Sequence, residues 1–194
     1  MAKKSNRNTR GRIVSAAWKL FYEQGYEDTT VEEIIELSGT SKGSFYHYFD
    51  GKDALLSTLS SLFDEKYEEL TGLLTPEMTA MEQLLFLNRE LFHMIEDSIS
   101  LDLLARLYST QLTTNGEKHL LDHNRIYYKL LRKIIAKGQD DGQLSCRSNV
   151  NEMVKLYALC ERALLYDWCL CAGEYALTEY SAKVLPGFLS SFLP

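Results

Sequence analysis

The sequence predicts an all-α protein of about nine helices, and three observations favour this fold class. Proline, the residue that most strongly interrupts a helix, occurs three times in 194 residues. No useful stretch alternates apolar and polar residues as a half-buried strand would. Apolar side chains instead recur every three or four residues, the spacing that gives a helix one face to bury.

The first helix is predicted from about Thr9 to Gln24. Gly25 follows it, and glycine is typical just past the end of a helix because it adopts positive φ at little cost. The apolar side chains of this segment fall on one stripe, which consists of Ile13, Ala16, Ala17, Leu20 and Phe21.

Two short helices joined at Gly39 are predicted between Thr30 and Phe49. Thr30 and Glu33 have the spacing of a capping box, in which each side chain bonds a backbone N–H at the other's position. Gly39 is expected to end the first of these helices in a tight turn, because positive φ costs glycine little.

The second short helix is expected to divide into a buried and an outward face. Thr40 or Ser41 can cap its start. Phe45 and Phe49 lie four residues apart and should therefore face the core together. The polar side chains that remain point outward and are Lys42, Ser44, Tyr46 and His47. A helical pair with such a surface is suited to contact DNA.

Six further helices complete the prediction, and the polar and glycine-containing segments between them mark their ends. We expect a first domain at 1–51, a connecting helix at 52–71 and a second domain at 72–194. The helices of the second domain are expected at about 75–96, 101–111, 117–137, 149–172 and 175–192.

The charge distribution fits a chain that binds phosphate with one end. The net charge is −6, which alone does not favour nucleic acid. Residues 1–22, however, contain six basic residues and no acid, so their charge is +6. The six are Lys3, Lys4, Arg7, Arg10, Arg12 and Lys19.

Several classes of protein are not favoured. No apolar run approaches the roughly 20 residues needed to cross a bilayer, so we expect no membrane association and a cytoplasmic protein. The four cysteines have neither disulfide-scaffold density nor paired zinc spacing, and we expect them to be reduced and mostly buried. We expect no cofactor and no catalytic residues, because no nucleophile, base and orienting group come together.

The segment TTVEEI, followed by SGTSKGSFYHYF and a lysine at position 52, resembles the DNA-binding domain of the tetracycline-repressor (TetR) family of bacterial transcriptional regulators. The resemblance is specific over roughly residues 9 to 56. It implies an N-terminal three-helix helix-turn-helix domain and a C-terminal helical domain for ligand binding and dimerisation. The function implied is a regulator, most simply a repressor, that binds a palindromic DNA operator as a homodimer and is released by a small-molecule effector.

The resemblance also identifies candidate DNA contacts. Its recognition segment corresponds to Ser41, Lys42, Gly43, Ser44, Tyr46, His47 and Tyr48, and its usual phosphate contacts correspond to Thr30, Thr40 and Lys52. For Tyr48, a place in a small aromatic core is an equal alternative.

The second domain offers candidates for an effector pocket and for a dimer interface. Side chains that could line a pocket between helices are Asn88, Arg89, Phe92, His93, Tyr108, Arg125, Tyr127, Tyr128 and Trp168. The helix at 149–172 is apolar on nearly all sides in its second half, so a monomer should leave part of it exposed. Pairing with a second copy would cover that surface, and the side chains expected there are Leu164, Leu165, Trp168, Cys171, Val184 and Phe188.

Some alternatives remain open at this point. The protein could be an all-helical small-molecule-binding or interaction protein with degenerate DNA contacts. Residues 39–43 satisfy G-x-S-x-G, the nucleophile elbow of α/β-hydrolases, but that motif requires a preceding strand. His119 and His123 have a spacing that could hold a metal on one helix. Cys169 and Cys171 could respond to redox state.

Overall fold

The computed structural model describes residues 2–113 and 118–194, with side chains from Thr9 onward. Throughout this part of the chain the regular structure is helical, which confirms the predicted fold class. The α-helices are α1 (Ala2–Gln24), α2 (Val31–Ser38), α3 (Lys42–Tyr48), α4 (Lys52–Leu56), α5 (Leu59–Thr71), α6 (Ala80–Ser98), α7 (Leu101–Thr113), α8 (Ile126–Asp140), α9 (Val150–Leu170) and α10 (Leu177–Leu189). Two short 3₁₀ segments are η1 (His119–Leu121) and η2 (Ser190–Phe192).

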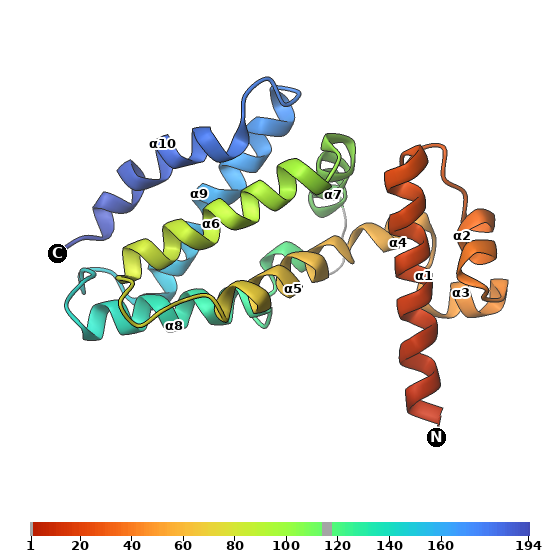
Figure 1. Cartoon of the computed structure of the whole chain (residues 1–194), viewed down its shortest axis with the longest axis horizontal. Coiled ribbons are helices and arrows are strands. Elements are labelled where there is room, and N and C mark those ends of the chain that lie inside the picture. Colours follow the sequence, from red (N-terminus) through yellow and green to blue (C-terminus); the bar gives the residue numbers. More distant parts are fainter. Residues whose placement is uncertain (1, 114–117) are drawn as a thin grey trace.

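The helices form two bodies joined through α4 and α5 (Figure 1). At one end α1 packs against α2 and α3. At the other end α8 packs against α5, α6 and α9, while α10 packs against α6 and α9. Helix α5 follows α4 closely in the chain and lies within the second body, so its position fixes where the first body is attached.

The core of the first body comes from the stripe predicted on α1 and from the inner faces of the next two helices. Ile13, Ala17, Ile34 and Phe45 are fully buried. Burying a side chain the size of isoleucine or phenylalanine contributes about 1.5–3 kcal/mol. This small core therefore holds α2 and α3 against α1 in one orientation.

The connecting helix predicted at 52–71 is two helices, with a break at Ser57 and Thr58. The Ser57 hydroxyl donates to Ala54 O at 2.7 Å, and the Thr58 hydroxyl donates to Leu55 O. Hydroxyls that bond the preceding turn in this way compete with the helical backbone pattern. Trp18 Nε1 also donates to Thr58 Oγ1 at 2.9 Å, which ties the break to α1.

The helix predicted from position 75 begins instead at Ala80. Thr79 caps it, since Glu82 N donates to Thr79 Oγ1 and Thr79 N donates to Glu82 Oε2. This is the same capping box that starts α2. The Thr-x-x-Glu spacing was present in the sequence, and it outweighs the proline at position 76 as a start signal.

The helix predicted at 117–137 begins at Ile126 and is preceded by η1. Asn124 N donates to Asp122 Oδ1 at 2.8 Å, a local turn that replaces helical bonding. His119 and His123 are therefore not on one helix, and the premise of a two-histidine metal site is wrong. No group of three potential metal ligands occurs among the described residues.

Helix α8 continues through Gly138, a position at which a side chain would not fit. A Cβ at Gly138 would lie 2.6 Å from the Ala80 Cβ and 2.8 Å from Leu144 Cδ1. Gln143 Oε1 then accepts a hydrogen bond from Ala80 N at 2.7 Å, so the turn after α8 also caps α6. Within the described residues, no helix has the length and apolar character needed to span a membrane.

Candidate nucleic-acid interface and ligand cavity

The turn between α2 and α3 is held by local hydrogen bonds. Gly39 has φ of 59°, in the left-handed region, and its N–H bonds the end of α2. Ser41 caps α3, accepting from Ser44 N at 3.1 Å. Arg12 Nη1 donates to Gly39 O at 3.4 Å, a contact from α1 that the sequence did not reveal. The arrangement is a helix-turn-helix, and because a helix precedes Gly39, the hydrolase motif lacks its strand.

Helix α3 has the two faces that were predicted. Phe45 is fully buried and Phe49 nearly so. The candidates on the exposed side are Ser41, Lys42, Gly43, Tyr46 and His47, while Thr40, Ser44 and Tyr48 are half-buried. The ring of Tyr48 lies 4.8 Å from that of His47.

Lys42 is the charged group that this surface offers to a phosphate. Its Nζ lies 3.6 Å from Glu32 Oε1, and both side chains are about 70% exposed. An exposed pair of this kind is worth at most about 1 kcal/mol, so a phosphate can replace Glu32. The ammonium also lies 5.9 Å from the centroid of the Tyr46 ring.

Gly43 has no packing reason to be glycine. A Cβ built there would meet nothing within 4 Å. Glycine in a helix costs up to about 1 kcal/mol relative to alanine, and no packing contact within the folded chain offsets that cost. Close approach of a partner's backbone is the use that its missing side chain permits.

Several candidate hydroxyls are already used within the chain. The Thr30 hydroxyl takes part in the α2 capping box. Thr40 Oγ1 lies 2.8 Å from Ser38 Oγ, and the hydroxyls of Ser41 and Ser44 lie 3.0 Å apart. A hydroxyl can accept a second bond, so DNA contacts by these residues stay predictions.

Lys52 is half-buried, and its charged group is bonded within the chain, so its contact with a phosphate stays a prediction. Its ammonium donates to Tyr26 O at 2.6 Å, Glu27 O at 3.2 Å and Thr29 O at 2.8 Å. It also lies 4.3 Å from the centroid of the Tyr26 ring. An ammonium has three donors, and all are engaged. In this structure Lys52 closes the turn between α1 and α2.

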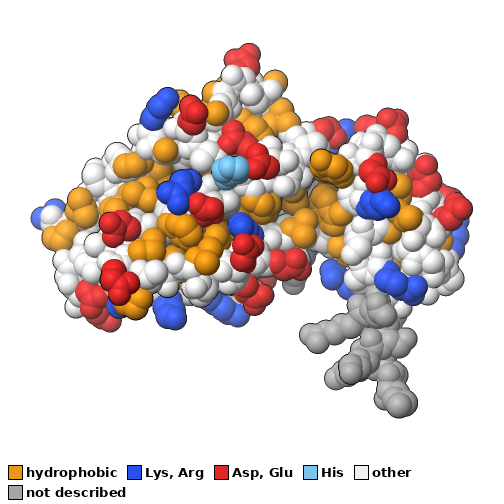
Figure 2. Space-filling model, in the orientation of Figure 1, with side chains coloured by type: hydrophobic (Ala, Val, Ile, Leu, Met, Phe, Trp, Pro, Cys, Tyr) orange, Lys and Arg blue, Asp and Glu red, His pale blue; other side chains and the backbone are white. Residues whose placement is uncertain are grey.

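Basic side chains of α1 adjoin the helix-turn-helix. Arg10 lies over the Phe49 ring at 5.4 Å, and Arg12 reaches Gly39. Figure 2 shows acidic side chains gathered near the C-terminal end of α1 and basic ones nearer its start. Lys19 Nζ lies 3.9 Å from Glu23 Oε1. Lys3, Lys4 and Arg7 lie outside the described side chains.

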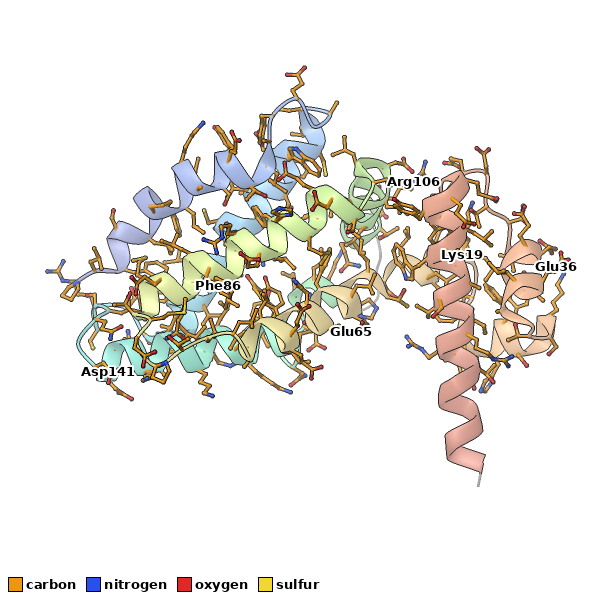
Figure 3. The ribbon with its side chains drawn as sticks, viewed as in Figure 1. Lys19, Glu36, Glu65, Phe86, Arg106 and Asp141 are labelled. Carbon is orange, nitrogen blue, oxygen red and sulfur yellow. The ribbon has the colours of Figure 1, made fainter. Side chains whose placement is uncertain are left out.

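Arg106 of α7 links the second body to the first (Figure 3). It forms ion pairs with Asp102 and with Glu27, and its guanidinium lies 4.9 Å from the centroid of the Tyr26 ring. Burial and a hydrogen bond to Asp53 raise the pKa of Tyr26 far above its ordinary value, so the ring stays neutral. Tyr26 thus lies against both Arg106 and Lys52.

A narrow cavity of about 50 Å³ lies in the second body between α5, α6, α7, α8 and α9. Four of the predicted pocket residues line it, namely Phe92, Tyr108, Arg125 and Tyr127. The sequence interpretation missed other lining residues, which include Phe63, Tyr67, Leu120, Glu161, Arg162 and Leu165.

The other five predicted pocket residues do not line this cavity. Tyr128 is buried beside it and donates to Leu120 O at 3.0 Å. Trp168 is buried, with its Nε1 donating to Tyr175 O. His93 is exposed, and its Nδ1 lies 2.7 Å from Asp97 Oδ2. Asn88 and Arg89 line a separate groove between α6 and α10, near Phe86 in Figure 3.

Glu161 is the centre of a buried polar network. It accepts from Asn88 Nδ2 at 2.9 Å and from the Tyr127 hydroxyl at 2.6 Å, and Ser181 donates to Asn88 Oδ1. Burial raises the pKa of the Glu161 carboxyl, while hydrogen bonds from Tyr127, Asn88 and Tyr157 oppose the rise. The network joins α6, α8, α9 and α10. An acid at helical spacing from Tyr157 and Leu164 was the available signal in the sequence.

Arg125 joins the start of α8 to α5. Its Nε and Nη2 donate to the two carboxylate oxygens of Asp64 at 3.0 and 3.1 Å, and Nη2 also donates to Ser60 O. The Arg125 and Asp64 side chains are only 9% and 17% exposed. Bidentate pairs between an arginine and a carboxylate are among the strongest polar contacts in proteins.

The apolar residues expected at the dimer interface are differently placed. Leu164, Leu165 and Trp168 are buried within the single chain, so the expectation that a monomer exposes them is wrong. The opposite side of α9 exposes Leu159 and Leu170. Helix α10 exposes Tyr180. Val184, Phe188 and Cys171 are half-buried.

The cysteines are free thiols, but none is fully buried, contrary to expectation: Cys146 is exposed and the other three are half-buried. Desolvation raises the pKa of Cys169 to about 11 and also raises that of Cys171. Thiols with raised pKa values are poorly reactive at neutral pH, so this pair offers no support for a redox switch.

A helix-turn-helix attached to a separate helical body is an arrangement typical of DNA-binding regulators. Residues 13–59 match the family model described as bacterial regulatory proteins, tetR family. This match covers the DNA-binding end of the chain, and it supports a transcriptional regulator of the TetR family.

Individual relatives support the same assignment. The regulator QacR of Staphylococcus aureus is 26% identical over 157 residues, covering 78% of this chain and 81% of that protein. An uncharacterized HTH-type regulator of Lactococcus lactis is 39% identical over 56 residues, covering 28% of this chain. That match spans only 29% of the Lactococcus protein's length. The Thermus thermophilus repressor FadR, solved with lauroyl-CoA, has a TM-score of 0.75 at 26% identity, with 95% of each chain covered.

We predict that Lys52→Ala lowers stability. The change removes three hydrogen bonds from a charged donor, and the expected loss is about 1–3 kcal/mol in the free energy of unfolding, measured by urea denaturation. Lys42→Ala is the matched control, since the loss of its exposed ion pair should change the free energy of unfolding by less than about 1 kcal/mol. Unchanged stability of Lys52→Ala, with a salt dependence of DNA binding reduced by about one unit, would instead support the predicted phosphate contact.

Proposed function

We propose that this protein is a ligand-responsive transcriptional regulator that binds a palindromic operator as a homodimer and is released by a small-molecule effector, most simply as a repressor. The observation that carries the proposal is the surface of α3, on which Lys42, Gly43, Tyr46 and His47 face outward from a buried Phe45. A rigid helix with such a face can enter the major groove while basic groups of α1 contact phosphates. We expect it to act in the cytoplasm.

The side chains suit a mixed readout of DNA. Lys42 can donate to a phosphate or to guanine O6 and N7. Gly43 lets the backbone approach the duplex, and Tyr46 and His47 can bond phosphate or pack on a thymine methyl. With a net charge of −6 for the chain, affinity depends on a few cations and should fall steeply with salt.

A homodimer would bring two such helices to one operator. The outward sides of α9 and α10 expose Leu159, Leu170 and Tyr180, beside the half-buried Val184 and Phe188. Apolar side chains that gather on one face favour a covered interface. A two-fold axis there would make a four-helix contact and set the half-site spacing at roughly 34–36 Å.

An effector site in the second body is supported by the cavity and by its neighbourhood. Phe92, Tyr108 and Tyr127 give it aromatic walls. The Thermus thermophilus protein of similar fold was solved with lauroyl-CoA, an amphipathic ligand.

Two contacts could carry the effect of a ligand to the DNA-binding body. Arg125 lines the cavity and is paired with Asp64 of α5, which follows α4 in the chain. Arg106 directly precedes Leu107, a cavity residue, and contacts Glu27 between α1 and α2. A shift of α7 or α8 would thus act on both attachments of the first body.

The test of DNA reading is footprinting of the purified protein on the genomic DNA that flanks its gene. We predict one protected palindrome. Lys42→Ala should weaken binding to it and reduce the slope of log affinity against log salt concentration by about one unit.

Arg89→Ala, which removes an exposed charge far from α3, is the control and should leave the footprint intact. Absence of any protected site in the wild-type protein would favour a small-molecule-binding or interaction protein without DNA recognition.

The dimer surface has its own test. We predict that the double variant Leu170→Asp, Tyr180→Asp is monomeric in sedimentation experiments. Dimer formation would have to remove the two introduced carboxylates from water, which is costly. Leu73→Asp is the control, since Leu73 is comparably exposed but lies in the turn after α5. A double variant that stays dimeric would place the interface elsewhere.

A further inference from the structure

A larger hollow adjoins the inner cavity. It is a groove of about 430 Å³ between the end of α7, η1 and the outer side of α9. A volume of this size is in the range of small-molecule sites. Most of its lining is apolar, with Leu112, Leu121, Leu159, Ala163 and Tyr166 among its walls.

The groove and the inner cavity share three lining residues, Tyr108, Leu120 and Arg162. The two hollows are therefore neighbours, and these three side chains form part of the wall of both. A ligand that lies in the groove can direct an apolar part inward toward Phe92 and Leu165, past Tyr108.

Arg162 is the charged group among the residues shared by the two hollows. It is half-buried, and its Nη1 donates to the Tyr128 hydroxyl at 3.2 Å. Among the described residues it forms no ion pair, whereas Arg125 is fully paired with Asp64. A guanidinium has five N–H donors. It can therefore hold a carboxylate with two parallel bonds without giving up Tyr128.

The nearby acid does not offer an equivalent site for a cation. Glu161 is fully buried, and its oxygens already accept from Asn88 and Tyr127. A cation would have to break this network to reach it. The charge that the hollow offers to a ligand is thus positive.

We propose that the groove binds an amphipathic anion, whose carboxylate lies on Arg162 and whose unbranched apolar chain lies along α9 and enters the inner cavity. This inference rests on the proposed effector-regulated function and names the chemical class of the effector. Leu159 belongs both to the groove wall and to the proposed dimer face, so a second protomer would border the ligand.

The test compares three probes that share one chain and differ in the head group, namely decanoate, decanol and decyltrimethylammonium. Calorimetric titration of the full-length protein without DNA should give the tightest binding for decanoate. Arg162→Gln should weaken decanoate binding about 10- to 100-fold and leave decanol binding unchanged. Arg162→Lys should weaken decanoate binding less than Arg162→Gln does, because lysine keeps the positive charge but cannot form the bidentate pair.

Arg132→Gln is the matched control. Arg132 is also a half-buried arginine, but it donates to His123 O and does not line the groove. Its replacement should leave decanoate binding unchanged.

Tighter binding of decyltrimethylammonium would overturn the proposal in favour of Glu161. Equal binding of decanoate and decanol, or no binding of any probe, would also overturn it. Footprinting without a ligand tests DNA recognition separately, so the two failures are distinguishable.

Discussion

The ion pair between Asp64 and Arg125 is the contact on which the placement of the DNA-binding body depends. It holds α5 against the start of α8, and both side chains are largely withdrawn from water. Removing one partner of a buried pair costs about 3–5 kcal/mol, because the other charge is left unpaired. On either side of Asp64, Phe63 and Tyr67 of the same helix line the inner cavity. Helix α5 therefore lines the inner cavity and also carries the attachment of the helix-turn-helix.

The rest of the second body is organised by the Glu161 network. A buried acid with neutral donors on α6 and α8 fixes how these helices lie against α9, since unsatisfied polar groups in a core are costly. A ligand that enters beside Tyr127 or Tyr108 must move side chains that belong to this network or pack against it. In the proposed regulator, such a displacement would reach α5 through Arg125. It would also reach the turn between α1 and α2, which contains Tyr26, through Arg106.

The features that the sequence predicted correctly are those that depend on neighbours along the chain. The capping box at Thr30, the left-handed Gly39 and the buried Phe45 follow from local spacing, and the family resemblance rests on the same residues. Features that depend on distant residues were not predictable. The carbonyls that hold Lys52 lie more than twenty residues earlier in the chain. Likewise, nothing local shows that Leu164, Leu165 and Trp168 face the chain's own core while Leu159 and Leu170 face outward.

The central claim, that α5 couples the cavity to the DNA-reading helices, is tested most directly by a double-mutant cycle on operator affinity. The cycle compares Asp64→Asn, Arg125→Gln and the double variant at a temperature at which all three are folded. We expect both single variants to bind the operator more weakly, and the double variant to lose less than the sum, with a coupling of about 0.5–3 kcal/mol. Operator affinities equal to that of the unmodified protein in all three variants would contradict the account.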